Sequence, residues 1–255
     1  MIIDCHVHLR GDYGSAQDAG DIQVKYADRL GIDRMCLSLG NFRTGIFDEE
    51  CAPAEFMIRH NDDVWRVCER HPERFIPFCY LNPCYLSDSL QEIERCIVNG
   101  PFRGIKLGLD MFCDQPNLDV LASRAAELSV PVLQHTWIKT TGNFPHESEP
   151  WRLADLAERH GETTFMMAHS GGNWEKGLKT IIDQANIVTD ICGGDPEIGE
   201  AEMAVRLVGV ERVVYGSDAP GRSYASQIAE VLGADLTEDE KAAILGGNMR
   251  RVLGL

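Results

Sequence analysis

Apolar, β-prone runs alternate with longer amphipathic stretches along the whole chain of 255 residues. A buried strand followed by a helix is the repeating unit of a parallel sheet, so this alternation predicts an α/β fold. The predicted strands are residues 2–8, 34–39, 75–81, 104–109, 130–135, 164–169, 187–191 and 212–216. The predicted helices are residues 18–30, 61–71, 86–98, 118–128, 150–160, 175–186 and 196–207.

Repeated strand–helix units of this kind describe a closed parallel (β/α)8 TIM barrel. About 250 residues is the usual size of that fold, so residues 1–255 are expected to form a single barrel domain. The rival architecture is an open doubly wound sheet, but no G-x-G-x-x-G motif follows the first predicted strand. The connections 40–59 and 136–149 are long, and long loops after barrel strands usually cover an active site. Thr237 and Glu240 stand at capping-box spacing and predict a further helix start.

The overall composition indicates which classes of binding partner and which cellular compartment suit this chain. The net charge of −16 argues against nucleic acid or an anionic membrane, because both attract basic surfaces. No apolar run approaches the ~20 residues of a membrane span, and the start of the chain lacks the pattern of a signal peptide. The nine cysteines are scattered without a C-x-x-C pair. We therefore expect reduced thiols in a cytoplasmic protein rather than a disulfide framework or a cysteine-ligated zinc.

Two histidines end the first predicted strand, in the run Asp4-Cys5-His6-Val7-His8. Side chains alternate between the faces of a strand, so we expect His6 and His8 on one face and Cys5 and Val7 on the other. Neutral imidazole is the commonest protein ligand for metals, and two imidazoles side by side suit one divalent ion. A pair of histidines whose hydrogen bonds are satisfied within the core is the plain structural alternative.

Further polar residues stand at the ends of later predicted strands. Lys106 lies in the fourth, His135 ends the fifth and His169 ends the sixth, while Asp218 follows the eighth. Barrel closure brings the carboxyl ends of all strands to one face, where barrel enzymes carry their chemistry. The sequence therefore predicts one site built from several strands.

This ordered set resembles the amidohydrolase superfamily of metal-dependent barrel enzymes. The resemblance is nearest to the branch that includes aminocarboxymuconate-semialdehyde decarboxylase, and it extends over essentially the whole chain. The H-x-H motif alone is weakly specific, whereas the ordered set is highly specific. The matching motifs are Asp4-Cys5-His6-Val7-His8, Gly104-Ile105-Lys106-Leu107, His135, Ala168-His169-Ser170-Gly171-Gly172, Gly216-Ser217-Asp218-Ala219-Pro220 and Gly247-Asn248-Met249-Arg250-Arg251-Val252-Leu253-Gly254-Leu255.

The resemblance implies a metal centre held by His6, His8, His135 and Asp218. One divalent ion is expected, with zinc as the first choice, manganese or iron as alternatives and a second metal left open. Such an ion lowers the pKa of a bound water and polarises a substrate oxygen. Asp218 would take the proton from that water, and His169 would be an acid/base or a ligand of a second metal.

Lys106 could have one of three roles. In binuclear members of the superfamily a lysine on the fourth strand is carbamylated and bridges two metals, whereas the decarboxylase-like branch is mononuclear. An ordinary ammonium group at Lys106 could instead bind a substrate carboxylate. A salt bridge with a neighbouring carboxylate is the structural alternative, and we expect an uncarbamylated lysine.

Residues in the loops after strands are weaker candidates for contacting substrate. Arg10 and Arg43 follow the first two strands and could clamp an anionic group, although a solvated salt bridge is the commoner role. Trp137 and His146 lie in the long loop after His135, where they could form a pocket wall. Ordinary loop packing explains them equally well.

The expected function is hydrolysis of an amide, lactone or ester of a small molecule by a metal-activated water. The alternative is non-oxidative decarboxylation of an unsaturated or aromatic acid by the same site. Arg10, Arg43 or Lys106 aimed into the pocket would favour the decarboxylase, which needs a cation for the carboxylate. Histidinol-phosphatase-like phosphoesterases also begin with H-x-H but need more ligands at strand ends. A metal-stabilised scaffold would need a closed ligand shell, and a homo-oligomer remains compatible with the sequence.

Overall fold

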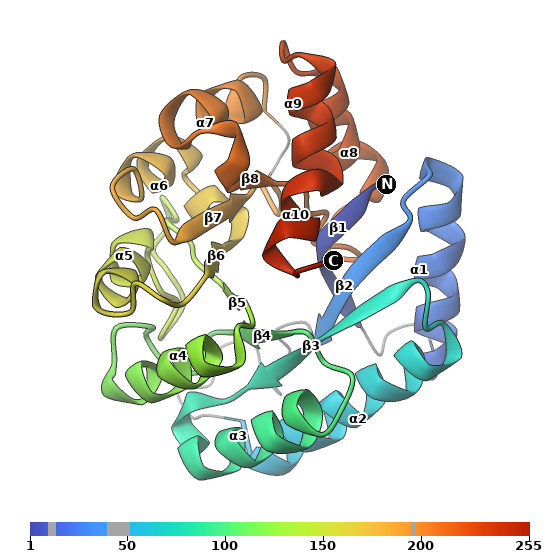
Figure 1. Ribbon diagram of the computed structural model, residues 1–255, viewed down its shortest axis with the longest axis vertical. Coiled ribbons are helices and arrows are strands. Elements are labelled where there is room, and N and C mark those ends of the chain that lie inside the picture. Colours follow the sequence, from blue (N-terminus) through green and yellow to red (C-terminus); the bar gives the residue numbers. More distant parts are fainter. Residues whose placement is uncertain (10–13, 40–51, 195–196) are drawn as a thin grey trace.

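Eight parallel strands form a barrel in which every strand pairs with its neighbours in chain order. The computed structural model describes residues 1–9, 14–39, 52–194 and 197–255. The last strand meets the first through hydrogen bonds from Cys5 N to Tyr215 O, at 2.9 Å, and from His8 N to Ala219 O, at 2.7 Å. The predicted (β/α)8 TIM barrel is therefore confirmed (Figure 1). The strands are β1 (Ile3–Leu9), β2 (Arg34–Leu39), β3 (Phe75–Leu81), β4 (Gly104–Leu107), β5 (Val132–Gln134), β6 (Phe165–Met167), β7 (Ile187–Asp190) and β8 (Val213–Val214).

Helices surround the strands on the outside (Figure 1). Local sequence sets their ends: Ser15 and Asp18 form a capping box at the start of α1, and Gly31 ends that helix at φ 68°. A second capping box, between Thr237 and Glu240, starts α9 as predicted. None of the described helices is long and apolar enough to cross a membrane. The helices are α1 (Ala16–Leu30), α2 (Ala54–Arg70), α3 (Leu86–Glu92), α4 (Pro116–Leu128), α5 (Pro150–Arg159), α6 (Trp174–Thr180), α7 (Glu200–Val208), α8 (Tyr224–Gly233), α9 (Glu238–Ala242) and α10 (Asn248–Val252).

Short helical turns complete the chain, and two of them matter below. A π-helical turn, η3 (Ile93–Val98), continues α3, and a turn called η4 (Ala168–Gly171) follows β6 directly. The others are η2 (Pro83–Tyr85), η5 (Val210–Arg212) and η6 (Ala243–Gly247). Helix α8 had no counterpart among the predicted helices, although its buried Tyr224, Ile228 and Val231 stand at helical spacing.

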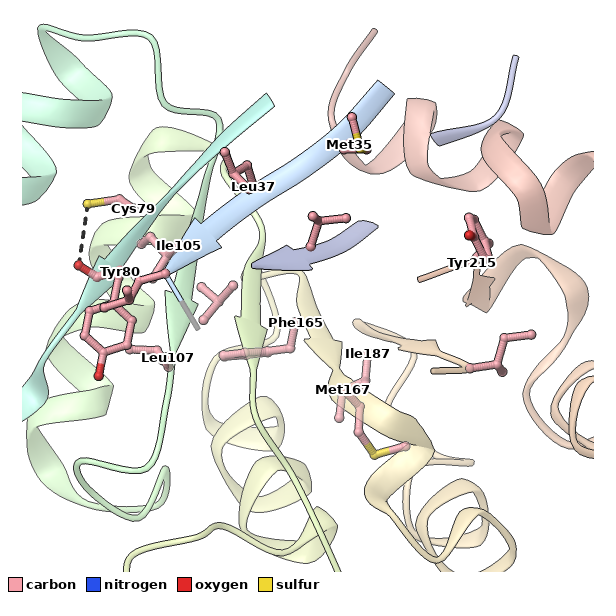
Figure 2. Close-up of a cluster of buried hydrophobic side chains, with 14 of the residues drawn as sticks. Met35, Leu37, Cys79, Tyr80, Ile105, Leu107, Phe165, Met167, Ile187 and Tyr215 are labelled. Carbon is pink, nitrogen blue, oxygen red and sulfur yellow. Dashed lines mark hydrogen bonds between the residues drawn. The ribbon is translucent and has the colours of Figure 1, made fainter. Parts of the chain in front are cut away.

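The apolar core has two parts separated by the barrel wall. The inner part contains Ile76, Phe78, Leu133 and Met166 from the strands, together with Met249 of α10. The outer part lies between strands and helices, and Figure 2 shows several of its side chains, including Leu37, Ile105 and Phe165. The wall therefore buries both faces of its strands, which explains why their sequences are continuously apolar.

Strand β1 departs from the simple alternation expected for its side chains. Cys5 belongs to the inner core and Val7 to the outer core, so the expectation that they share a face is wrong. The pairing register of β1 with β2 shifts between Asp4 and Val7. A bulge of this kind re-aims side chains, and here it lets Cys5 and His6 both reach the interior.

The cysteines are mostly buried thiols rather than cross-links. Cys84 is disulfide-bonded, so the expectation of a chain without disulfides is wrong at that position. The free cysteines of the described residues are Cys5, Cys36, Cys68, Cys79, Cys96, Cys113 and Cys192.

Candidate metal centre and active site

The barrel brings the predicted polar residues together at the carboxyl ends of its strands. The His6 ring lies 4.7 Å from the His8 ring and 4.9 Å from the His169 ring, measured between centroids. The rings of His135 and His169 are 5.0 Å apart. The Asp218 carboxylate lies 3.2 Å from Nε2 of His8. Four imidazoles and one carboxylate thus converge from β1, β5, β6 and β8.

Three of these imidazoles have one ring nitrogen held by a group that accepts hydrogen bonds. His6 Nδ1 lies 2.8 Å from the Asp190 carboxylate, and His135 Nε2 lies 2.9 Å from the Glu147 carboxylate. His169 Nδ1 lies 3.1 Å from the carbonyl oxygen of Cys192. Each neutral ring therefore carries its hydrogen on that nitrogen and donates it outward. The other nitrogen of each ring faces the centre without a hydrogen.

Some of the inward-facing atoms have the spacing of ligands on one ion, and the ligand atoms of His6, His8 and Asp218 lie within 4.8 Å of one another. His135 Nδ1 and His169 Nε2 are 3.2 Å apart, although neither carries a hydrogen to share. Nε2 of His6 is buried without a hydrogen-bond partner. Two ligands at the ~2.05 Å of a zinc–nitrogen bond stand about 2.9–3.3 Å apart, for angles between 90° and tetrahedral. A divalent cation would satisfy these lone pairs, so the residues present fit a metal.

Burial keeps the imidazoles neutral, as metal ligands must be. It lowers the pKa of His6 well below its ordinary value, with the Lys106 charge adding to the effect. It likewise lowers the pKa values of His135 and His169. Burial opposes ionisation of Asp218, but its hydrogen bond with His8 and its interactions with the neighbouring histidines outweigh burial, and its pKa lies below the usual range. The centre thus offers neutral nitrogens and one ionised carboxylate.

Lys106 is fully buried beside this centre. Its Nζ has no hydrogen-bond partner, and no ion pair of Lys106 occurs among the residues that the structure describes. Burial lowers its pKa to about 8, against the opposing charges of Asp190 and Asp218. Lys106 therefore forms no salt bridge with a described residue, and its side chain supplies a positive charge without a partner.

Unusual backbone positions aim two of the site residues. His169 has φ 63° and Asp218 has φ 55°, in the left-handed region that ordinary residues rarely adopt. Gly193 makes room for the first of these, because a Cβ there would lie 2.0 Å from His169 Nδ1. The Gly-rich runs around both residues in the sequence are thus explained by the turns that they form.

The weaker candidates for contacting substrate differ in their distance from the centre. Trp137 lies against the centre, with its ring 4.8 Å from that of His169 and stacked on that of His135 at 6.0 Å. His146 instead packs edge-on against Phe112, with ring centroids 5.5 Å apart. Arg10 and Arg43 lie outside the described residues.

Sequence reasoning missed the groups that orient the imidazoles. Asp190 ends β7 and accepts hydrogen bonds from His6 Nδ1, from the backbone N–H of His169 at 2.6 Å and from Cys192 Sγ at 3.1 Å. An acid within the apolar run 187–191 was the available signal. Glu147 gave no signal, because it is one of two glutamates in a polar loop.

Residues 3–255 match the family model described as amidohydrolase. The chain belongs to the amidohydrolase family. It is 24% identical over 275 aligned residues to a 2-amino-3-carboxymuconate-6-semialdehyde decarboxylase from Dictyostelium discoideum, covering 92% of this chain and 76% of that protein.

Solved structures of the same fold include a 2,6-dihydroxybenzoate decarboxylase complexed with 2,6-dihydroxybenzoate. It matches with a TM-score of 0.81 at 18% identity, over 100% of this chain and 99% of that one. A dihydroxybenzoic acid decarboxylase from Polaromonas sp. JS666, with bound manganese and the inhibitor 2-nitroresorcinol, matches with a TM-score of 0.79 at 17% identity, over 100% and 97% of the two chains. At these identities the likeness establishes the fold.

The expectation of a hydrolase is wrong in its reaction type, because the relatives are named as decarboxylases. That this chain is an enzyme of the amidohydrolase superfamily is supported. The error has a physical origin: a set of histidines and one aspartate fits a divalent ion whether water or a carboxylate reacts beside it. That Lys106 Nζ is buried without a hydrogen-bond partner is a property that only the structure reveals.

Proposed function

We propose that this protein is a metal-dependent decarboxylase that removes carbon dioxide from an unsaturated or aromatic acid. The observation that carries the proposal is the Lys106 ammonium group, which is buried and unpaired beside the imidazole cluster. A charge buried without a partner is costly, and a substrate carboxylate would supply the missing partner. The named relatives and the manganese in one solved relative support the same reading.

In this proposal one divalent ion is held by His6, His8, His135 and Asp218. Zinc suits this set of nitrogens with one carboxylate, and manganese is the alternative that the solved relative favours. When bound, the ion would act as a Lewis acid toward an oxygen of the substrate. Asp190 and Glu147 would hold His6 and His135 in the tautomer that leaves a nitrogen free for it.

The remaining chemistry falls to residues of the chain. The bond from carbon to the carboxylate breaks, its electron pair stays on the carbon, and that carbon takes up one proton. We assign delivery of this proton to His169, because its Nε2 faces the cluster, 3.2 Å from His135 Nδ1, and could carry a proton taken up from solvent to the substrate carbon. Asp218, held ionised, is the proposed base for an acidic proton of the substrate. Lys106 would bind the carboxylate, and Trp137 would line the pocket for a flat ring.

The first experiment is a substrate screen with protein loaded with Mn²⁺ or Zn²⁺. Candidate acids are 2,6-dihydroxybenzoate and conjugated unsaturated carboxylic acids, and released carbon dioxide is measured by mass spectrometry. We expect release from at least one class, and none from the double variant His6→Ala/His8→Ala, which would also lose the ion. A metal-loaded, folded protein that releases no carbon dioxide from either class would overturn the proposal.

Lys106→Met separates a substrate-binding lysine from a structural one. The pKa of Lys106 falls from 10.5 to about 8 on burial, a difference worth about 3 kcal/mol of folding free energy at neutral pH. Removing the charge should therefore raise the melting temperature while activity is lost. A structural lysine would give the opposite change in stability. The exposed Lys179→Met variant is the control, and it should change neither property.

The proposal treats the chain as one catalytic domain that acts on a small molecule. Whether it works as a homo-oligomer and whether it resides in the cytoplasm are left as predictions from the sequence.

A further inference from the structure

A second cluster of metal-binding groups lies outside the barrel interior. Cys79 on β3, Glu92 at the end of α3 and Cys96 in η3 are all buried. Their ligand atoms lie within 4.8 Å of one another. Both cysteines belong to the outer core between strands and helices, and Figure 2 shows Cys79 on the outer side of its strand. The cluster therefore shares no residue with the centre formed by His6, His8 and Asp218.

Glu92, the last residue of α3, and Cys96 of the following π-helical turn η3 lie on one face. Glu92 and Cys96 are four residues apart, and Cys96 Sγ lies 3.6 Å from Glu92 Oε2. A tetrahedral ion with bonds of ~2.3 Å to sulfur and ~2.0 Å to oxygen separates such ligands by about 3.5 Å. Turns of this type are frequent at functional sites. The pair already has the spacing that an ion would require.

A divalent cation could bind in this cluster without changing the net charge of the buried group. Arg95 binds both oxygens of Glu92, at 2.7 and 2.8 Å, and also binds Asp62 at 2.7 Å, so a cation already pairs with the Glu92 carboxylate. Asn61 Nδ2 lies 2.9 Å from Glu92 Oε2 and 3.5 Å from Cys79 Sγ. If two thiol protons leave as one M²⁺ enters, the net charge of the buried group is unchanged. Burial of the ion therefore adds no uncompensated charge.

We propose that Cys79, Cys96 and Glu92 form a second metal site, specific for a thiophilic divalent cation such as Zn²⁺ or Cd²⁺ and separate from the catalytic centre. Two sulfurs and one oxygen select a soft ion over Mg²⁺ or Mn²⁺. Arg95 and Asn61 act as the outer partners that hold the carboxylate in place. An ion here would tie β3 to η3 and stabilise the folded state.

The test is a Cd²⁺ titration of protein that keeps its Cys84 disulfide and is already loaded with Mn²⁺, followed by thiolate-to-cadmium absorption in the ultraviolet. We expect a band that saturates in the wild type and disappears in both Cys79→Ser and Cys96→Ser. Cys192→Ser is the matched control, because Cys192 Sγ is the thiol beside His6 at the catalytic centre. That variant should keep the band. Circular dichroism confirms that each serine variant is folded.

The thermal shift is the second readout. Cd²⁺ or Zn²⁺ should raise the melting temperature of the wild type and of Cys192→Ser, but not that of Cys96→Ser. Three results overturn the proposal: no band in the wild type, a band lost only in Cys192→Ser, or a titration showing that Cys79 and Cys96 have formed a disulfide in place of binding an ion.

Discussion

Glu147 is the residue whose replacement examines the metal centre most selectively. Its carboxylate accepts hydrogen bonds from His135 Nε2 at 2.9 Å and from the backbone N–H of Phe144 at 2.9 Å. Lys139 Nζ lies 2.6 Å from each of its oxygens. Glu147→Gln keeps the size of the side chain but leaves one acceptor oxygen in place of two. Either Phe144 or His135 must then face the amide NH₂ group.

The expected loss of metal affinity depends on which group faces the amide NH₂ of the new glutamine. If the amide NH₂ faces His135, the ring must carry its hydrogen on Nδ1, which removes that nitrogen as a ligand. If the oxygen faces His135, the Phe144 N–H loses a charge-assisted bond worth about 1.5–3 kcal/mol. Loss of a partner that orients a metal-bound histidine typically weakens metal affinity about 10- to 100-fold, or about 1.4–2.8 kcal/mol. We expect Glu147→Gln to fall in this range.

The assay is competition for Zn²⁺ or Mn²⁺ against a chelator of known affinity, at one pH. Glu149→Gln is the matched control, because Glu149 lies in the same loop and pairs with Arg152 at 2.7 Å rather than with an imidazole. Its affinity should equal that of the wild type. If Glu147→Gln binds metal as tightly as the control does, the proposed role of Glu147 is refuted.

Three further predictions concern the proton path, the backbone and pH. The Asp218→Asn variant should keep much of its metal, while its turnover falls about 100-fold or more. Metal content and turnover are measured on the same sample, and near-normal turnover would exclude Asp218 as the base. Gly193→Ala should displace His169 and lower turnover by up to about 100-fold, more than it lowers stability; unchanged kinetics would contradict the contact. Burial raises the pKa of Glu200 to about 7, and burial with repulsion from Glu200 raises that of Glu230 to about 9, so the folded state holds extra protons and stability falls between about pH 5 and 9. Glu230→Gln should therefore raise the melting temperature more at pH 9 than at pH 6, and an equal change at both would count against the shared proton.

The fold was predictable because each strand is a short, continuously apolar run, and these runs alternate with amphipathic helical stretches. Strands β2 and β3 agree with their predicted bounds, and β1 to β8 all lie where a strand was expected. The later strands are shorter than predicted: β5 starts after Pro131, and Ala168–Gly171 turns into η4 rather than extending β6. Hydropathy does not show where a strand ends, because residues in a buried turn are as apolar as those in the strand before it.

The site was only half predictable, for a related reason. His6, His8, His135, His169 and Asp218 stand at strand ends, so barrel closure alone brings them together. Asp190 and Glu147 act by hydrogen bonds across about 180 residues and across a loop, and no periodicity encodes such pairings. The reaction type was missed because histidines and an aspartate at strand ends fit a divalent ion in either reaction. The unpaired state of Lys106 depends on its three-dimensional surroundings.

The most direct test of the account uses isotopes in the solvent. With an acid found active in the screen, the metal-loaded protein is incubated in D₂O and, separately, in water enriched in ¹⁸O, and the product is analysed by mass spectrometry. Decarboxylation predicts one deuterium on the carbon that lost carbon dioxide and no ¹⁸O in the organic product, with no product from His6→Ala/His8→Ala. A product that carries ¹⁸O and no deuterium would contradict the account.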